Sequence, residues 1–214
     1  MSRRLALAIG RTALALLTIA AMAYQWWESS SRGVLVPLNF LSYFTIQSNA
    51  IGAAVFLVGA ARWRQAATPR WDLVRGASAL NLTVTFVVFA LLLSNTDVDV
   101  ANSWVNTVVH TIFPLAVILD WLIDPPTHHI SGRASLAWLV YPLAWLAYTM
   151  IRGLVAGWYP YPFLDPANGG YGSVALYVLG ILAFGIVVIA VLRVAGNALR
   201  DRRLVPLATG TPAG

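Results

Sequence analysis

The chain alternates long apolar runs with short polar segments, and these runs set the expected architecture. A helix that crosses a bilayer needs about 17 to 25 mostly apolar residues. Runs close to that length occupy six ranges: Leu5–Tyr24, Phe40–Ala61, Gly76–Leu93, Trp104–Ile123, Ala134–Leu154 and Val174–Val194. Their length and their flanking Gly, Pro and Arg residues identify them, because they are apolar nearly all round. The pattern predicts an all-α polytopic membrane protein, a bundle of six transmembrane helices forming one domain over residues 1–203, with a disordered tail over residues 204–214.

Composition supports this architecture and excludes several classes of site. Hydrophobic residues make up 59% of the chain and charged residues 10%, whereas about a quarter of a soluble domain is charged. The absence of cysteine excludes disulfides, thiolate metal ligands and a cysteine nucleophile. His128 and His129 lie in a predicted loop far from His110, so the three histidines do not converge. We expect no metal and no cofactor.

The basic residues, all arginine, are distributed unevenly between the loops. They lie between apolar runs rather than in one stripe, so the net charge of +6 does not indicate a nucleic-acid partner. One set of loops, with the chain ends, holds Arg3, Arg4, Arg62, Arg64, Arg70, Arg75, Arg133, Arg200, Arg202 and Arg203, against Arg32 alone in the other set. Because arginine is retained on the cytoplasmic side, we predict a multi-pass protein of the plasma (inner) membrane with cytoplasmic N- and C-termini.

An alternative interpretation of the first run is a cleaved signal peptide. Arg3 and Arg4 precede an apolar core, and Ala21 to Ala23 has the small-residue pattern of a cleavage site. Against this, Arg11 interrupts the core, and about twenty residues is long for such a region. We therefore expect the first run to remain as a helix.

Polar residues gather in the outer halves of two predicted helices. Ser42, Thr45 and Asn49 are three and four residues apart and would share one face of the second helix. His110 lies on the order of 9 Å below the start of the fourth run, against about 7.5 Å for Thr45 in the second, at 1.5 Å per residue. Pro114 would leave the carbonyl of His110 without its helical partner. These features predict the wall of an outward-facing cavity.

Each polar residue also has a structural interpretation. Ser and Thr in membrane helices often bond their own backbone, and Asn often bridges two helices. An intramembrane histidine is a functional candidate by default. On the fifth helix, Tyr141, Trp145, Tyr148 and Arg152 share a face. Arg152 either extends to the headgroups or faces an anionic group in a cavity, and the loop "GWYPYPFLDPANGGYG" forms either a rigid lid or an interfacial belt.

Three short motifs resemble a known family. "FLSYFT" opens the second helix, "HTIFP" covers residues 110–114, and "GWYPYPFLD" covers residues 157–165. In this order, and with six helices, the chain is similar to small bacterial membrane proteins related to the androgen-induced and androgen-dependent TFPI-regulating proteins of animals. The animal proteins are threonine hydrolases that cleave fatty acid esters of hydroxy fatty acids with an intramembrane threonine and a histidine. The polar "TIQSN" stretch departs from the animal pattern.

The resemblance implies a set of roles in an ester hydrolase. Matching the motifs assigns the base to His110 and the nucleophile to Thr45, or to Ser42 if "NFLS" is matched instead. The expected oxyanion and orienting residues are Asn49, Ser48, Gln47 and Asn106, and the expected substrate-binding residues are Arg152, Tyr148, Trp145, Tyr161 and Phe163. The substrate would be a membrane lipid or an amphiphilic ester. Two alternatives stay open: a lipid- or proton-coupled transporter or lipid-binding protein, and a structural membrane subunit.

Overall fold

The described residues of the computed structural model form helices and helical turns joined by loops. The structure describes residues 2–94 and 102–204. Along the chain the elements are α1 (Arg3–Ser31), α2 (Pro37–Ser42), α3 (Phe44–Ala61), α4 (Pro69–Val88), η1 (Phe89–Leu93), α5 (Ser103–Thr107), η2 (Val108–Ile112), α6 (Phe113–Ile123), α7 (Gly132–Ser135), η3 (Leu136–Leu139), α8 (Val140–Ala156), η4 (Pro162–Leu164), η5 (Pro166–Asn168) and α9 (Gly170–Leu204). The turns η1 and η2 are π-helical, and η3, η4 and η5 are 3₁₀ turns.

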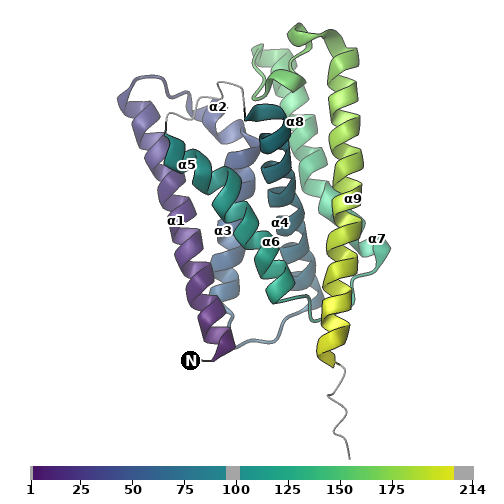
Figure 1. The fold of residues 1–214 in the computed structure, drawn as a ribbon. Coiled ribbons are helices and arrows are strands. Elements are labelled where there is room, and N and C mark those ends of the chain that lie inside the picture. Colours follow the sequence, from purple (N-terminus) through teal and green to yellow (C-terminus); the bar gives the residue numbers. More distant parts are fainter. Residues whose placement is uncertain (1, 95–101, 205–214) are drawn as a thin grey trace, which may run out of the picture.

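Six helical segments are long and apolar enough to cross a membrane, as the sequence predicts. They are Arg3–Ser31, Phe44–Ala61, Pro69–Leu93, Ser103–Ile123, Gly132–Ala156 and Gly170–Leu204. They stand side by side in one bundle (Figure 1), and the described chain begins and ends at the same end of it, which we call the terminal end. We call the opposite end the distal end. The side of the membrane that each end faces stays a prediction.

The structure differs from the predicted elements at the start of the tail and within the second run. Leu204, the first residue of the predicted tail, is the last residue of α9, and residues 205–214 lie outside the described residues. The second run, predicted as one helix over Phe40–Ala61, is broken at Tyr43, whose backbone is extended with φ −64° and ψ 130°. Ser42 therefore ends α2 while Thr45 lies in the first turn of α3, so the two do not share a helical face.

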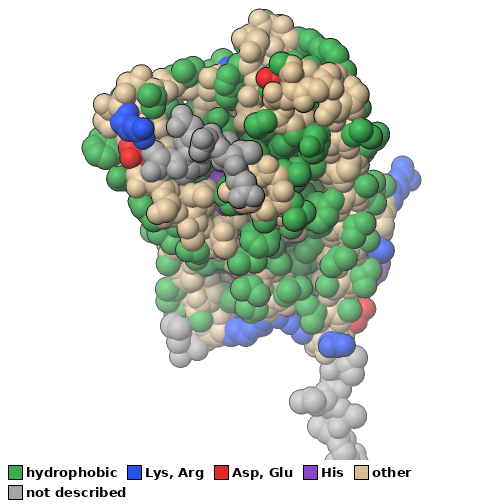
Figure 2. Space-filling view, turned by 45° about the horizontal axis from the view of Figure 1, so that its top comes forward, with side chains coloured by type: hydrophobic (Ala, Val, Ile, Leu, Met, Phe, Trp, Pro, Cys, Tyr) green, Lys and Arg blue, Asp and Glu red, His purple; other side chains and the backbone are tan. Residues whose placement is uncertain are grey.

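The packed interior lies between helices with small residues at their contacts. In the main core, Trp121 and Trp138 are almost fully buried and meet edge to face. A Cβ atom on Gly76 would lie 2.1 Å from the Trp138 ring, so only glycine allows α4 to approach it this closely. On the face that Figure 2 shows, apolar side chains are spread along the side of the bundle, and basic side chains gather at the terminal end. This distribution suits a surface that faces hydrocarbon along the sides.

An ionic cluster joins three of the helices near the terminal end. Arg11 on α1 contacts Asp120 through two bonds of 2.7 and 3.0 Å, and Arg75 on α4 contacts the same carboxylate at 3.0 Å. Asp124, just after α6, also contacts Arg11 at 2.7 Å. Burial alone would raise the pKa of Asp124, but Arg75 and Arg11 outweigh it and hold the pKa below its usual value. The resulting stabilisation is present above about pH 4 and is lost as the pH falls further.

Candidate functional site

Thr45 and His110 come together inside the distal half of the bundle. The Thr45 Oγ1 atom lies 3.2 Å from His110 Nε2, and the two side chains come from α3 and from the π-helical turn η2. Both residues are buried, with exposed fractions of 8% and 5%. A hydroxyl and an imidazole at this distance form a hydrogen bond, so the structure brings these two predicted site residues together.

Asn106 defines which imidazole nitrogen carries the proton. Its Oδ1 atom lies 2.6 Å from His110 Nδ1, one turn away on the same span. A carbonyl oxygen can only accept, so Nδ1 donates its proton to Asn106. Nε2 then presents its lone pair to the Thr45 hydroxyl, which is the arrangement that a general base requires.

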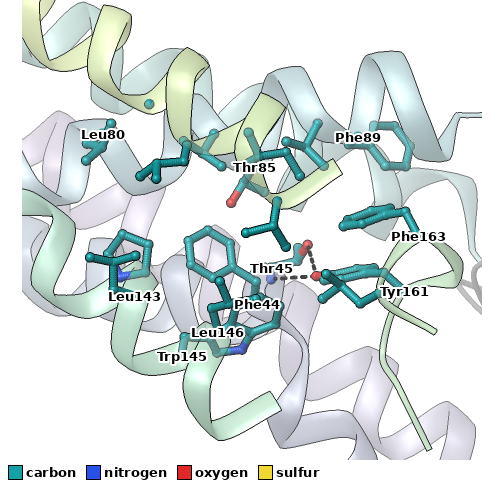
Figure 3. Close-up of a pocket in the computed structure, with 18 of the residues that line it drawn as sticks. Phe44, Thr45, Leu80, Thr85, Phe89, Leu143, Trp145, Leu146, Tyr161 and Phe163 are labelled. Atoms are coloured by element: carbon teal, nitrogen blue, oxygen red, sulfur yellow. Dashed lines mark hydrogen bonds between the residues drawn. The ribbon is translucent and has the colours of Figure 1, made fainter. Parts of the chain in front are cut away.

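Tyr161 contacts Thr45 from the loop between α8 and η4. Its hydroxyl accepts the backbone N–H of Thr45 at 3.3 Å and lies 3.4 Å from Thr45 Oγ1 (Figure 3). Burial raises the pKa of Tyr161 to about 12. The phenol is therefore neutral at physiological pH, and its own proton is free to be donated toward Thr45 or a group bound beside it. Phe163, a predicted substrate-binding residue, stacks on the Tyr161 ring with centroids 5.3 Å apart.

The backbone break at Tyr43 is stabilised by two side chains expected elsewhere in the site. Gln47 Nε2 donates to the carbonyl of Leu41 at 2.7 Å, and Trp145 Nε1 donates to the carbonyl of Ser42 at 3.0 Å. These carbonyls lie at the end of α2, just before the break, and backbone groups in hydrocarbon need a partner inside the protein. Gln47 also accepts from Tyr141 at 2.9 Å. Gln47 was expected at an oxyanion, but both ends of its amide are bound elsewhere.

The other polar residues of the second run are likewise engaged. Ser42 Oγ donates to the Leu38 carbonyl at 2.6 Å and lies 2.8 Å from the Tyr148 hydroxyl. Ser48 bonds Thr45 O and Thr85 Oγ1 at 3.2 and 2.9 Å. Their hydroxyls are thus committed to bonds away from His110.

Asn49 links the two spans that carry the site. Its Nδ2 atom donates to the carbonyls of Thr45 and Val109, at 2.8 and 3.0 Å. In the π-helical turn the N–H of Phe113 reaches back to Val108, so the local backbone pattern differs from that of an α-helix. The sequence predicted that Pro114 would leave the His110 carbonyl without a helical partner. In the structure, the Asn49 side chain instead donates to the carbonyl of Val109, one residue earlier.

Two cavities meet at Thr45 and Tyr161. The first, which we call the apolar chamber, has a volume of about 120 Å³ and is walled by α3, α4, α8, α9 and the η4 turn (Figure 3). The second, which we call the vestibule, has a volume of about 190 Å³. It includes Gln25, Asn39 and His110 in its wall and reaches the loop after α1 at the distal end. Thr45 and Tyr161 line both cavities.

Arg152 stands behind the vestibule rather than in its wall. Its Nη2 atom donates to Asn39 Oδ1 at 2.6 Å, and its guanidinium lies over the Trp158 ring, 4.6 Å from the centroid. Asn39 and Trp158 both line the vestibule. Asn39 and Trp158 thus lie between the positive charge of Arg152 and the vestibule.

The sequence did not single out Phe89. Its ring, in the π-helical turn η1, stacks on the His110 imidazole with centroids 3.9 Å apart and planes 15° from parallel. A single phenylalanine within an apolar run carries no distinguishing signal. The Phe89 ring covers one face of the imidazole and, with the bonds at both ring nitrogens, fixes its orientation.

Comparisons with protein-family models, curated proteins and solved structures gave no match. Residues 2–94 and 102–204, which the structure describes, also contain no group of three His, Asp or Glu side chains that could hold a metal ion.

Proposed function

We propose that this protein is an intramembrane hydrolase of lipid esters, with Thr45 as nucleophile and His110 as general base. The observation that carries the proposal is the 3.2 Å contact of Thr45 Oγ1 with His110 Nε2, while Asn106 holds Nδ1. This activity agrees with the resemblance of the three sequence motifs. Between the two candidate nucleophiles, the geometry supports Thr45, because Ser42 bonds Leu38 and Tyr148 instead.

The reaction would follow the usual course of acyl transfer. Thr45 Oγ attacks the ester carbonyl as its proton moves to His110 Nε2, and the tetrahedral intermediate expels the alcohol, which takes that proton. Water then attacks the acyl-threonine and gives a proton to Nε2. Collapse of the second intermediate releases the fatty acid and returns the proton to Thr45. A buried hydroxyl needs such a neighbouring base, because it is a weak nucleophile alone.

Tyr161 is the best-placed donor for the oxyanion. Its hydroxyl lies 3.4 Å from Thr45 Oγ1. The hydroxyl oxygen accepts the Thr45 N–H, so the hydroxyl proton remains available for donation to an oxyanion. Thr45 also lies in the first turn of the 18-residue helix α3, whose N-terminal dipole favours negative charge. Asn49, Ser48 and Gln47, the donors expected from the sequence, are bound to other groups.

The two cavities fit the two sides of an ester. The apolar chamber would take the acyl chain, and the vestibule would take the alcohol part, because the vestibule has more polar side chains in its wall, among them Gln25, Asn39 and His110. A free carboxylate on the alcohol part would find Arg152 behind Asn39 and Trp158. Trp145 and Phe163 would form part of the wall of the acyl side.

The proposal predicts covalent labelling at one residue. Purified protein in detergent, treated with a fluorophosphonate probe and digested, is expected to carry the label on Thr45 by mass spectrometry. His110→Ala should remove the label, since the hydroxyl loses its base. A protein that binds lipid or cross-links its helices without hydrolysis would remain unlabelled and would release no acid from a p-nitrophenyl ester.

Asn106 gives a separate prediction about positioning. Asn106→Leu removes the acceptor for Nδ1–H, so kcat should fall by about 10²-fold, within the range that a positioned general base contributes. KM should change little, because Asn106 is not in the wall of either cavity. Asn106→Asp keeps an acceptor oxygen and should restore most of kcat. Equal losses in both variants would show that the residue acts through packing and not through the imidazole.

A further inference from the structure

A third cavity lies on the side of the bundle. It has a volume of about 580 Å³ and runs between the distal half of α4 with η1 and the distal half of α9. We call it the lateral groove; its walls are formed by Val87, Val88, Leu91 and Leu92 on one side and by Ser173, Leu176, Tyr177, Gly180, Ile181 and Phe184 on the other. Leu91 and Leu176 are 75% and 74% exposed, so the groove is bounded by side chains that face the hydrocarbon surroundings of a membrane.

The lateral groove is adjacent to the apolar chamber. Val88 and Ile181 line both cavities, so these two aliphatic side chains form part of the wall between the groove and the apolar chamber beside Thr45. Aliphatic side chains change rotamer on fast timescales at partly exposed positions. Both residues are only partly buried, which leaves them room to move.

We infer that the lateral groove is the route by which the hydrocarbon chain of a membrane lipid ester reaches the apolar chamber from the bilayer. This inference rests on the proposed function and extends it by naming the substrate class: esters with a long acyl chain that reside in the membrane. The polar part of such an ester would lie on the side of the vestibule, at the other face of Thr45.

The shape of the cavities favours a single hydrocarbon chain over a protein partner. A helix is about 10 Å across, and the chamber that continues the groove holds about 120 Å³. A helix docked in the groove could not extend into that chamber, whereas a flexible acyl chain could occupy both. Lipid tails are as apolar as the groove residues, so transfer from the bilayer removes no polar contacts.

Gly180 offers a way to block the groove without disturbing the helix. A Cβ atom built on Gly180 has no neighbour within 4 Å, and the same holds for Gly172 on the same helix. Gly180 lines the groove and Gly172 does not. Gly180→Trp therefore fills the groove, and Gly172→Trp is its matched control.

The test compares two esters in proteoliposomes. Gly180→Trp should lower the ratio of p-nitrophenyl palmitate to p-nitrophenyl butyrate turnover by about tenfold, equivalent to a barrier increase of about 1.4 kcal/mol. The short ester can reach Thr45 through the vestibule, so its turnover sets the reference. Gly172→Trp should leave the ratio unchanged. An unchanged ratio in Gly180→Trp, with its melting temperature preserved, would overturn the lateral route.

A second measurement does not depend on hydrolysis. A palmitate analogue with a diazirine near its chain end, irradiated in proteoliposomes with the wild-type protein, should cross-link to peptides that carry groove residues such as Leu91 and Tyr177. Cross-linking there without hydrolysis of any ester would leave the route standing and refute the hydrolase. Hydrolysis with cross-links confined to other faces of the bundle would refute the route alone.

Discussion

Thr45→Ala is expected to lower kcat/KM for ester hydrolysis by about 10⁴-fold or more, the scale seen when a catalytic nucleophile is removed. The hydroxyl that lies 3.2 Å from His110 Nε2 is lost, and no other described hydroxyl bonds that nitrogen. Purified variant and wild type are compared with a p-nitrophenyl ester in detergent, and with the fluorophosphonate label. Labelling and turnover should disappear together.

Three controls separate the nucleophile from its surroundings. Thr45→Ser keeps a hydroxyl and should retain part of the activity. Thr83→Ala removes a hydroxyl that bonds its own helix at the Ala79 carbonyl, and should leave turnover unchanged. Ser42→Ala should keep the label. If Ser42→Ala loses turnover while Thr45→Ala keeps it, the nucleophile is Ser42 and the motif must be matched through "NFLS".

Asp120→Ala is expected to reduce the free energy of unfolding by about 3 to 5 kcal/mol, the cost of removing one partner from a buried ion pair. Asp120 joins α1 and α4 to α6 through Arg11 and Arg75, and the exposed fraction of its side chain is 11%. Its loss leaves two arginines in a poorly hydrated site with only Asp124 beside them. The measurement is the thermal or denaturant midpoint in detergent.

The control for this prediction is an ion pair of the same chemistry at the surface. Asp201 contacts Arg200 and the exposed fraction of its side chain is 58%. Exposed pairs contribute about 0 to 1 kcal/mol, so Asp201→Ala should change the midpoint little. A combined Arg11→Leu and Asp120→Leu variant should recover part of the loss, because apolar residues often replace a buried pair without cost. Equal effects of the Asp120 and Asp201 variants would show that the cluster is not desolvated.

The number of spans and the similar depth of Thr45 and His110 could be predicted from the sequence, whereas the side-by-side position of their two helices could not. Apolar length identifies membrane helices, and a constant rise per residue places two side chains at the same depth. Arg11 and Asp120 were recognisable as charges within or near the ends of runs. Their pairing was not, because it depends on which helices are neighbours.

The features that could not be predicted arise from contacts between distant segments. The break at Tyr43 has no proline or glycine at its position, and it is stabilised by the Trp145 side chain from another span. The roles of Gln47 and Asn49 follow from the same cause, because their partners are backbone carbonyls freed by irregular turns. Tyr161 was expected near the substrate, but its bond to the Thr45 backbone depends on how the loop folds over α3.

The π-helical turn η2 affects how an inserted or deleted residue changes the register of its span. A π turn holds one residue more than an α turn would, so inserting or deleting a residue there rotates everything on its distal side by about 100° relative to α6. Trp121, in α6 on the other side of this turn, donates to the Leu192 carbonyl. The angular register of Asn106 and His110 can thus be adjusted separately from the half of the span that anchors it in the bundle.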